Sequence, residues 1–225
     1  QEPIMYATTS GTTKTPKLIP VTAQSKADLS GLIRIWLSAV LRDYPSFFDH
    51  GILTITSPAV EEYTERNIPM GSMSGLTRAR TSRLVRRRYI IPLEVNEIAD
   101  YDLRYFVVAR LAYGTRVSGV ITPNPSTVLR LIRLGMDEYE RIIRAVAEGT
   151  LGIDKETWES QSLEQQALLS TVEATLKPNP TRAGFLESMV RRYGYLSPKG
   201  VWPELSLIGC WLGGSAGIQA EQMRT

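Results

Sequence analysis

The apolar residues of this chain recur at two spacings, one typical of amphipathic helices and one of short buried strands. Between Pro20 and Pro45 they follow the i, i+3, i+4, i+7 pattern of a helix. Thr22 or Ser25 can cap the start of this helix, and Pro45 ends it. Its apolar stripe predicts a helix that covers a sheet.

Other segments have the length of strands or repeat the helical pattern. The predicted strands are residues 3–7, 52–55, 117–121 and 205–212. The further predicted helices are 94–113, stopped by Gly114, a pair over 128–148, broken at Gly135 and ended by Gly149, and 185–193. We expect residues 58–77 to be irregular, with a mobile glycine-rich loop at 70–75, and residues 150–180 to form a peripheral helical insert.

Strands that alternate with amphipathic helices predict an α/β fold, in which helices flank a largely parallel sheet. Ligands on such sheets bind beyond the carboxyl ends of the strands. Loops at residues 9–14 and 213–216 each follow a predicted strand, so we expect them to meet over one edge of the sheet. The turn at 123–126 falls on the same predicted edge, where Ser126 can cap the next helix.

Composition narrows the class of protein only modestly. The 225 residues suffice for one large domain or two small ones, and the net charge of +3 favours no particular partner. Because Cys210 is the only cysteine, no disulfide can form within the chain, and we expect a buried thiol and a cytoplasmic location. His50 is the only histidine, which argues against a histidine-rich metal site. The sequence contains no signal peptide and no membrane-spanning run.

The densest candidate chemistry lies in a short segment near the start of the chain. Four hydroxyl residues surround a glycine there and two lysines follow, namely Thr9, Ser10, Gly11, Thr12, Thr13, Lys14 and Lys17. Hydroxyls and backbone N–H groups donate to phosphate oxygens, glycine lets the backbone approach closely, and lysine adds a point charge. The alternative is an ordinary Ser/Thr-rich turn. The spacing does not match the P-loop of nucleotide hydrolases.

This segment has the order of a known family motif. The run Tyr-x-Thr-Thr-Ser-Gly-Thr-Thr-x-x-Pro-Lys, starting at Tyr6, resembles the core motif of the firefly-luciferase-like adenylate-forming superfamily. Its continuation, Pro-Lys-Leu-Ile-Pro-Val-Thr, is similar to the acyl-acid amido synthetases, which join auxin or jasmonate to amino acids in plants and have bacterial relatives. Lys14 stands where the superfamily usually has glycine.

The resemblance implies a ligase that uses ATP and Mg²⁺ to turn a carboxylic acid into an acyl-adenylate, then transfers the acyl group to an amine or amino acid. It also implies that the motif wraps the β- and γ-phosphates of ATP. The segment containing Gly213, Gly214 and Ser215 resembles the family's Gly-Ser loop beside the adenine or acyl group. Further substrate-side candidates are Arg80, Asn124 and Ser126.

Several family elements do not occur before Thr225. They are the magnesium-binding glutamate motif, the ribose-binding aspartate motif and the C-terminal domain with its lysine. We therefore expect residues 1–225 to form part of an adenylation domain of a monomer, with a helical insert around 150–200. We assign no metal ligand and no catalytic residue to this chain, and we expect it to be inactive alone.

Two features leave other functions open. Six arginines occur between residues 78 and 88 with no acid among them, namely Arg78, Arg80, Arg83, Arg86, Arg87 and Arg88. A solvated helix face is the simplest interpretation, but a non-catalytic module could bind an acidic partner there. An ATP-hydrolysing phosphotransferase is a further alternative. Asp100 and Asp102 could act in acid–base chemistry, although arginine partners near a helix explain them more simply. A serine hydrolase is excluded, because there is no Gly-x-Ser-x-Gly elbow.

Overall fold

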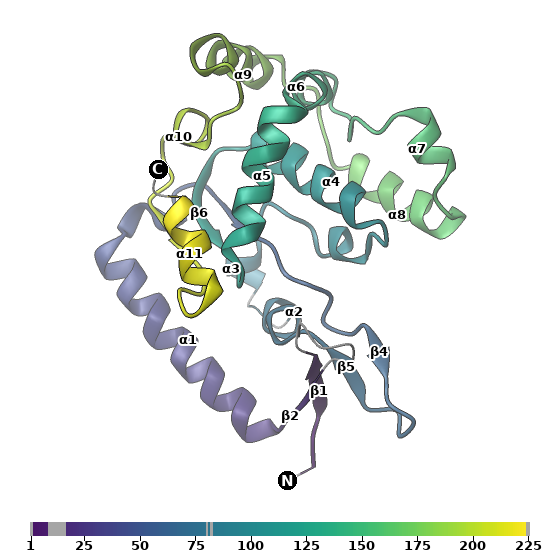
Figure 1. Ribbon diagram of the computed structural model, residues 1–225, viewed down its shortest axis with the longest axis vertical. Coiled ribbons are helices and arrows are strands. Elements are labelled where there is room, and N and C mark those ends of the chain that lie inside the picture. Colours follow the sequence, from purple (N-terminus) through teal and green to yellow (C-terminus); the bar gives the residue numbers. More distant parts are fainter. Residues whose placement is uncertain (1, 9–16, 80, 82, 224–225) are drawn as a thin grey trace. The chain divides into compact units, whose positions relative to one another are not determined.

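The computed structural model describes residues 2–8, 17–79, 81 and 83–223 (Figure 1). The chain divides into two compact units. Unit 1 comprises residues 1–45 and 56–87, and unit 2 comprises residues 46–55 and 88–225. Both units combine helices with a sheet, so the predicted α/β class is confirmed.

Unit 1 is built on a four-stranded sheet with the order β2-β1-β5-β4. Its strands are β1 (Met5–Thr8), β2 (Leu18–Val21), β4 (Glu62–Tyr63) and β5 (Pro69–Gly71). β1 pairs antiparallel with β2 and parallel with β5. Met5 and Ala7 lie two residues apart and therefore face the same side, where they pack with Val21 in a small core. The sequence did not predict β2, which tolerates Pro20 because it is an edge strand.

Helix α1 (Ala23–Asp43) begins and ends where the sequence predicts. Thr22 Oγ1 accepts a hydrogen bond from the Ser25 backbone N–H at 3.1 Å, and Ser25 Oγ accepts one from the Thr22 N–H at 2.9 Å, which together form a capping box. The apolar stripe, however, is not covered as predicted. Leu32 is 64% exposed, and Val40 is the buried residue of this helix.

Residues 58–77 contain more regular structure than the mostly irregular segment that the sequence predicted. They contain β4, β5 and most of α2 (Met73–Ala79), and α3 (Arg83–Arg86) follows. A Cβ atom at Gly71 would lie 2.3 Å from the Ala59 carbonyl oxygen, and one at Gly75 would lie 2.4 Å from the Ser57 carbonyl oxygen. The glycines that suggested a mobile loop instead allow close packing of backbones.

Unit 2 contains a three-stranded parallel sheet with the order β3-β6-β7. Its strands are β3 (Gly51–Thr54), β6 (Val117–Ile121) and β7 (Leu207–Gly209). Its helices are η1 (Pro45–Phe48), η2 (Leu93–Glu97), α4 (Tyr101–Tyr113), α5 (Pro125–Asp137), α6 (Tyr139–Glu148), α7 (Lys155–Glu159), α8 (Leu163–Glu173), α9 (Pro180–Tyr193), α10 (Pro198–Val201) and α11 (Ser215–Gln222). The predicted strands at 52–55 and 117–121 are confirmed, whereas β7 is shorter than predicted.

Two predicted helix boundaries are wrong for reasons that are visible in the packing. The helix expected over 94–113 is divided, because the Asp100 carboxylate accepts hydrogen bonds from the N–H groups of Asp102 and Leu103 and so starts α4 anew. α5, in contrast, continues through Gly135. A Cβ atom at this glycine would lie 2.2 Å from the Tyr113 hydroxyl, so the glycine makes room for an aromatic ring rather than ending the helix.

The core of unit 2 includes polar groups that bond to backbone carbonyls. Tyr113 and Trp202 stack with ring centroids 5.0 Å apart, and the Tyr113 hydroxyl donates to the Leu131 carbonyl at 3.1 Å. Burial raises the pKa of Tyr113. The guanidinium of Arg110 donates to the carbonyls of Thr150 and Ala145, and its burial lowers its pKa to about 10. These bonds join α4 to the end of α6.

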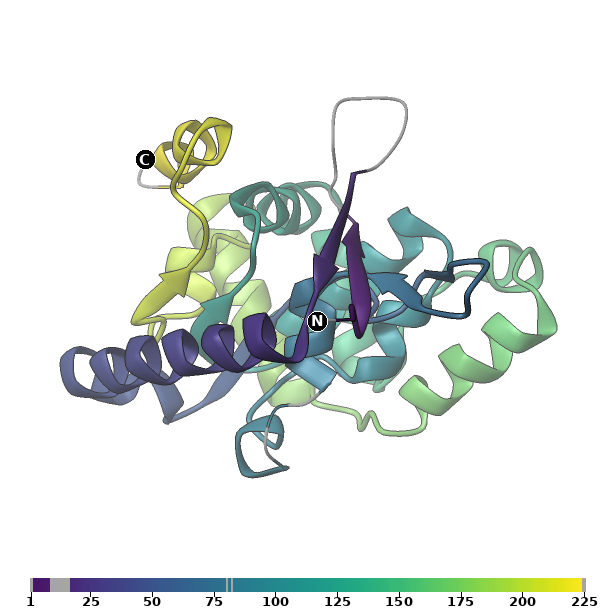
Figure 2. The same ribbon diagram turned by 90° about the horizontal axis from the view of Figure 1, so that it is seen from below.

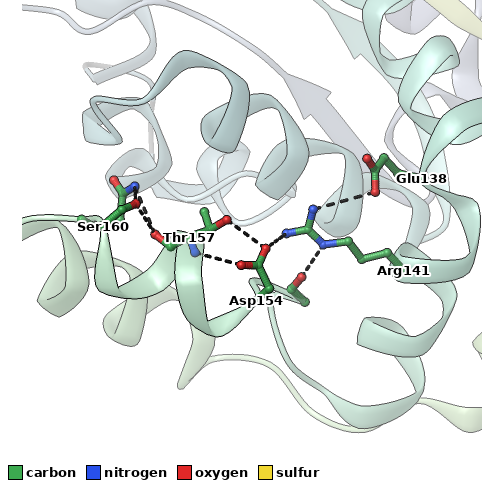
Figure 3. A network of polar contacts seen from close by, with 7 residues as sticks. Glu138, Arg141, Asp154, Thr157 and Ser160 are labelled. Carbon is green, nitrogen blue, oxygen red and sulfur yellow. Dashed lines mark hydrogen bonds and ion pairs between the residues drawn. The ribbon is translucent and has the colours of Figure 1, made fainter.

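The segment after α6 is helical, as the pattern of residues 150–180 predicts. Figure 3 shows how it is attached: Arg141 on α6 donates through Nε to the Gly152 carbonyl at 2.6 Å and lies 3.6 Å from the Asp154 carboxylate. Asp154 caps α7 by accepting hydrogen bonds from the Thr157 N–H and hydroxyl, each at 2.8 Å. One arginine therefore connects α6, the loop and the start of α7.

Candidate functional site

The strands β1 and β2 bring the two ends of the hydroxyl-rich segment together. Thr8 pairs with Leu18 in antiparallel register, and Figure 2 shows the two strands, in purple, running in opposite directions. Lys17 immediately precedes β2, and its side chain is exposed. The other candidates of this group lie outside the described residues, namely Thr9, Ser10, Gly11, Thr12, Thr13 and Lys14.

A carboxylate lies beside the last residue of β1. The Thr8 hydroxyl is 3.3 Å from Glu61 Oε2 and equally far from the Gly71 carbonyl oxygen, and it can donate to either. The Glu61 N–H in turn donates to the Met70 carbonyl at 2.7 Å. No signal in the sequence pointed to Glu61, because its position depends on the pairing of β1, β5 and β4.

In unit 2 the carboxyl ends of β6 and β7 lie side by side. The Thr122 N–H donates to the Gly209 carbonyl at 3.0 Å, and the Trp211 N–H donates to the Pro123 carbonyl at 3.1 Å. The turn at 123–126 and the glycine loop after β7 therefore share one sheet edge, as predicted. The prediction that the strands before residues 9–14 and 213–216 share one sheet is wrong, because β1 and β7 belong to different sheets. Residues 9–14 themselves lie outside the described residues.

The turn before α5 assigns its two polar residues different roles. Asn124 Oδ1 accepts a hydrogen bond from the Ser126 N–H at 3.0 Å, so Asn124, rather than Ser126, is the helix cap. Pro125 occupies the first turn, where its missing N–H costs nothing. The side chain of Ser126 is free of the cap and lines a groove along α5.

The glycine loop after β7 runs directly into α11. Gly214 has a φ of 58° and precedes the helix, which starts at Ser215. A Cβ atom at Gly213 or Gly214 would meet no heavy atom within 4 Å. Next to this loop, Trp211 is 71% exposed and Leu212 is 65% exposed. The sequence placed both in the predicted strand 205–212, whereas β7 ends at Gly209, so this exposed apolar surface was missed.

The remaining candidates separate into exposed and buried groups. Arg83, Arg86 and Arg87 are exposed, in agreement with a solvated helix face. Arg78 is not part of that face, since it is only 3% exposed, and Arg80 lies outside the described residues. Cys210, predicted to be buried, is partly exposed, and its partial burial raises the pKa of its thiol.

The suspected acid pair is structural. Asp100 caps α4, and Asp102 forms an ion pair with Arg130 on α5. This agrees with the arginine partner that the sequence favoured over acid–base chemistry. In the part of the chain that the structure describes, no three acidic, histidine or cysteine side chains are grouped to hold a metal ion. Nor does any described helix have the length and apolar character needed to cross a bilayer.

Comparison with known proteins identifies the family of this chain. All 225 residues match the model of the GH3 family N-terminal domain. The chain belongs to the GH3 family. This confirms the relationship to acyl-acid amido synthetases inferred from the motif after Tyr6.

Solved structures support the same assignment of fold for this GH3 chain. One, described as GH3.15 acyl acid amido synthetase, has a TM-score of 0.74 and 17% identity over 98% of this chain and 37% of that chain. Another, AtGH3.15 acyl acid amido synthetase in complex with 2,4-DB, has a TM-score of 0.70 and 17% identity over 95% of this chain and 37% of that chain. The GH3 chain thus spans 37% of the length of these structures. No curated protein matches it.

Proposed function

We propose that this chain is the N-terminal part of an ATP-dependent ligase that activates a carboxylic acid as an acyl-adenylate and transfers the acyl group to an amine or amino acid. The observation that carries the proposal is the match of the entire chain to the GH3 N-terminal domain. The hydroxyl-rich motif between β1 and β2 supports it, because a connection held at both ends by paired strands can present donors to one anion.

Each candidate group has a chemical task in this proposal. Adenylation brings together two anions, ATP and a carboxylate, so charge neutralisation and alignment carry most of the catalysis. The hydroxyls and backbone N–H groups of residues 9–13, with Lys14 and Lys17, hold the phosphates that leave as pyrophosphate. A Cβ atom at Gly213 or Gly214 would meet no heavy atom within 4 Å, so a planar base or acyl group can lie against the backbone there. Ser215 is included from the resemblance to the family's Gly-Ser loop.

The acyl-acid side of the proposal rests on the shared edge of β6 and β7. Ser126 offers a hydroxyl there, and Asn124 serves first as a helix cap. Arg80 is proposed as a substrate contact only because the segment that contains it resembles a substrate-side segment of the family. Magnesium would act by shielding the phosphate charge. The described residues do not fit a resident Mg²⁺ site, because no suitable cluster of carboxylates occurs among them, and no step is assigned to the ion.

The partners proposed for the whole protein are a small carboxylic acid and an amine or amino acid, and the proposed location is the cytoplasm. Product analysis tests the reaction. With ATP, a panel of carboxylic acids and a panel of amino acids, the full-length protein should form AMP, pyrophosphate and an amide. Release of ADP independent of any carboxylic acid would contradict the proposal and favour a phosphotransferase.

The role of Lys17, which immediately precedes β2, can be tested separately. Lys17→Ala should weaken ATP binding by about tenfold, because it removes a charge-assisted contact to phosphate. Lys26→Ala on α1 is the matched control: it removes the same charge outside the motif and should leave affinity within about twofold. Titration calorimetry measures both variants. Equal losses in the two variants would show a general charge effect and contradict the assignment of Lys17.

A further inference from the structure

One face of α5 forms the wall of a groove in unit 2. Ser126, Arg130, Arg133 and Asp137 recur at i, i+4, i+7 and i+11, so they lie along the same side of the helix. Leu134 and Tyr101, the first residue of α4, complete a groove of about 400 Å³. The opposite side of α5 is buried in the core, and α4 and α5 pack against one another (Figure 1).

The guanidinium of Arg130 is held in place on several sides. It lies 4.4 Å from the ring centroid of Tyr101 and 4.5 Å from that of Tyr105, and it forms an ion pair with Asp102. The Tyr105 hydroxyl is itself 3.3 Å from Thr127 Oγ1, which anchors the ring to α5. Such a guanidinium loses little conformational freedom when a ligand accepts its remaining N–H groups.

Arg133 differs from Arg130 in having no hydrogen-bond or ion-pair partner among the described residues. Three residues apart on a helix, the two side chains are neighbours, and both border the same groove. The lining therefore carries two guanidinium groups and the Ser126 hydroxyl against one carboxylate, that of Asp137. Because Asp102 pairs with Arg130, Arg133 is the cation of this lining that has no ion-pair partner among the described residues.

We propose that this groove binds a small phosphate monoester. A phosphoryl group offers three terminal oxygens, and the two guanidinium groups and the Ser126 hydroxyl offer donors to all three, whereas a carboxylate has only two oxygens. Tyr101, which is 51% exposed, and Leu134 supply an apolar surface for the group that the phosphate carries. The groove contains no residue of the motif after Tyr6, and it shares Ser126 with the acyl-acid side of the proposed function.

Phenyl phosphate is a suitable probe, since it combines a phosphoryl group with a ring. It should bind the 225-residue chain and perturb backbone NMR signals of α5. Arg133→Gln should weaken this binding by about tenfold, because it removes a charge-assisted donor, and it should leave the fold intact because Arg133 is exposed. Asp137→Asn should tighten binding by about twofold, because it removes a like charge from the end of the groove.

Arg144→Gln on α6 is the matched control, since it removes an exposed arginine outside the groove. Its affinity for phenyl phosphate should equal that of the unaltered chain. The proposal is overturned if Arg133→Gln binds unchanged, if Arg144→Gln loses as much affinity, or if phenyl phosphate does not bind at millimolar concentration. Benzoate binding as tightly as phenyl phosphate would overturn the choice of a phosphoryl ligand. Weaker binding of phenyl phosphate by Asp137→Asn would also contradict the choice of a phosphoryl ligand. The Asp137 carboxylate would then assist binding, and a ligand with both a positive and a negative charge would fit the groove better.

Discussion

Asn124 and Asp154 each use a side-chain oxygen to accept hydrogen bonds at the start of a helix. At the scale of single residues, these two caps show which parts of a site the sequence could predict and which it could not. Turns and capping residues follow from local chemistry and could be predicted. Whether a particular polar residue caps a helix or faces a ligand depends on which oxygen meets which N–H. Ser126 and Asn124 are two positions apart, and only the structure separates their roles.

The cap at Asp154 makes a prediction about pH. The pKa of this carboxyl is lowered by hydrogen bonds from the Thr157 N–H and hydroxyl, and to a smaller degree by Arg141. A pKa that is lower in the folded state stabilises the structure above the unfolded pKa, and this stabilisation is lost as the pH falls through the folded value. Protection of the Thr157 amide against hydrogen exchange should therefore decrease below about pH 4, near the ordinary pKa of aspartate.

Asp154→Asn provides the control for that prediction. Asparagine is also a good cap, so amide protection at pH 7 should persist, while its loss at low pH should largely disappear. Asp154→Ala should lose protection at both pH values. An Asn variant that retains the full pH dependence would show that another group titrates.

At the scale of helices and strands, the sequence correctly predicted those elements that are determined by the residues within them. The helix α1 and the strand β6 lie where periodicity and caps place them. The strands β2, β4 and β5 were missed because they are two to four residues long and exist through pairing with residues distant in the chain. The predicted end of a helix at Gly135 was wrong for a related reason, since that glycine accommodates Tyr113 from another helix.

Two glycines of unit 2 should respond oppositely to the same substitution. A Cβ atom at Gly119 in β6 would lie 2.2 Å from the buried ring of Phe47, so Gly119→Ala should lower the free energy of unfolding by about 1–3 kcal/mol through overpacking. At Gly184 in α9, a Cβ atom would meet no heavy atom within 4 Å. Gly184→Ala should therefore raise the free energy of unfolding by about 0.5–1 kcal/mol. Urea unfolding followed by tryptophan fluorescence measures both. A stabilised Gly119→Ala variant would contradict the packing described for β6.

At the scale of the whole molecule, the candidate groups are distributed over two units and two sheets. Unit 1 carries the hairpin that flanks the hydroxyl-rich motif, and unit 2 carries the edge formed by β6 and β7. The motif after Tyr6 and its continuation to Thr22 were enough to predict the family from the sequence, because both are contiguous runs of residues that can be read without the fold. Neither the division into two sheets nor the groove on α5 could be predicted, since both arise from contacts between distant segments.

The central claim is that this GH3 chain contributes the phosphate-binding part of an enzyme that forms acyl-adenylates. Isotope exchange between pyrophosphate and ATP in the full-length protein tests it most directly, because exchange requires reversible adenylate formation and no amine. We predict exchange that depends on an added carboxylic acid and that falls about tenfold in Lys17→Ala but not in Lys26→Ala. ATP turnover to ADP without carboxylate-dependent exchange, across a broad panel of acids, would contradict the claim.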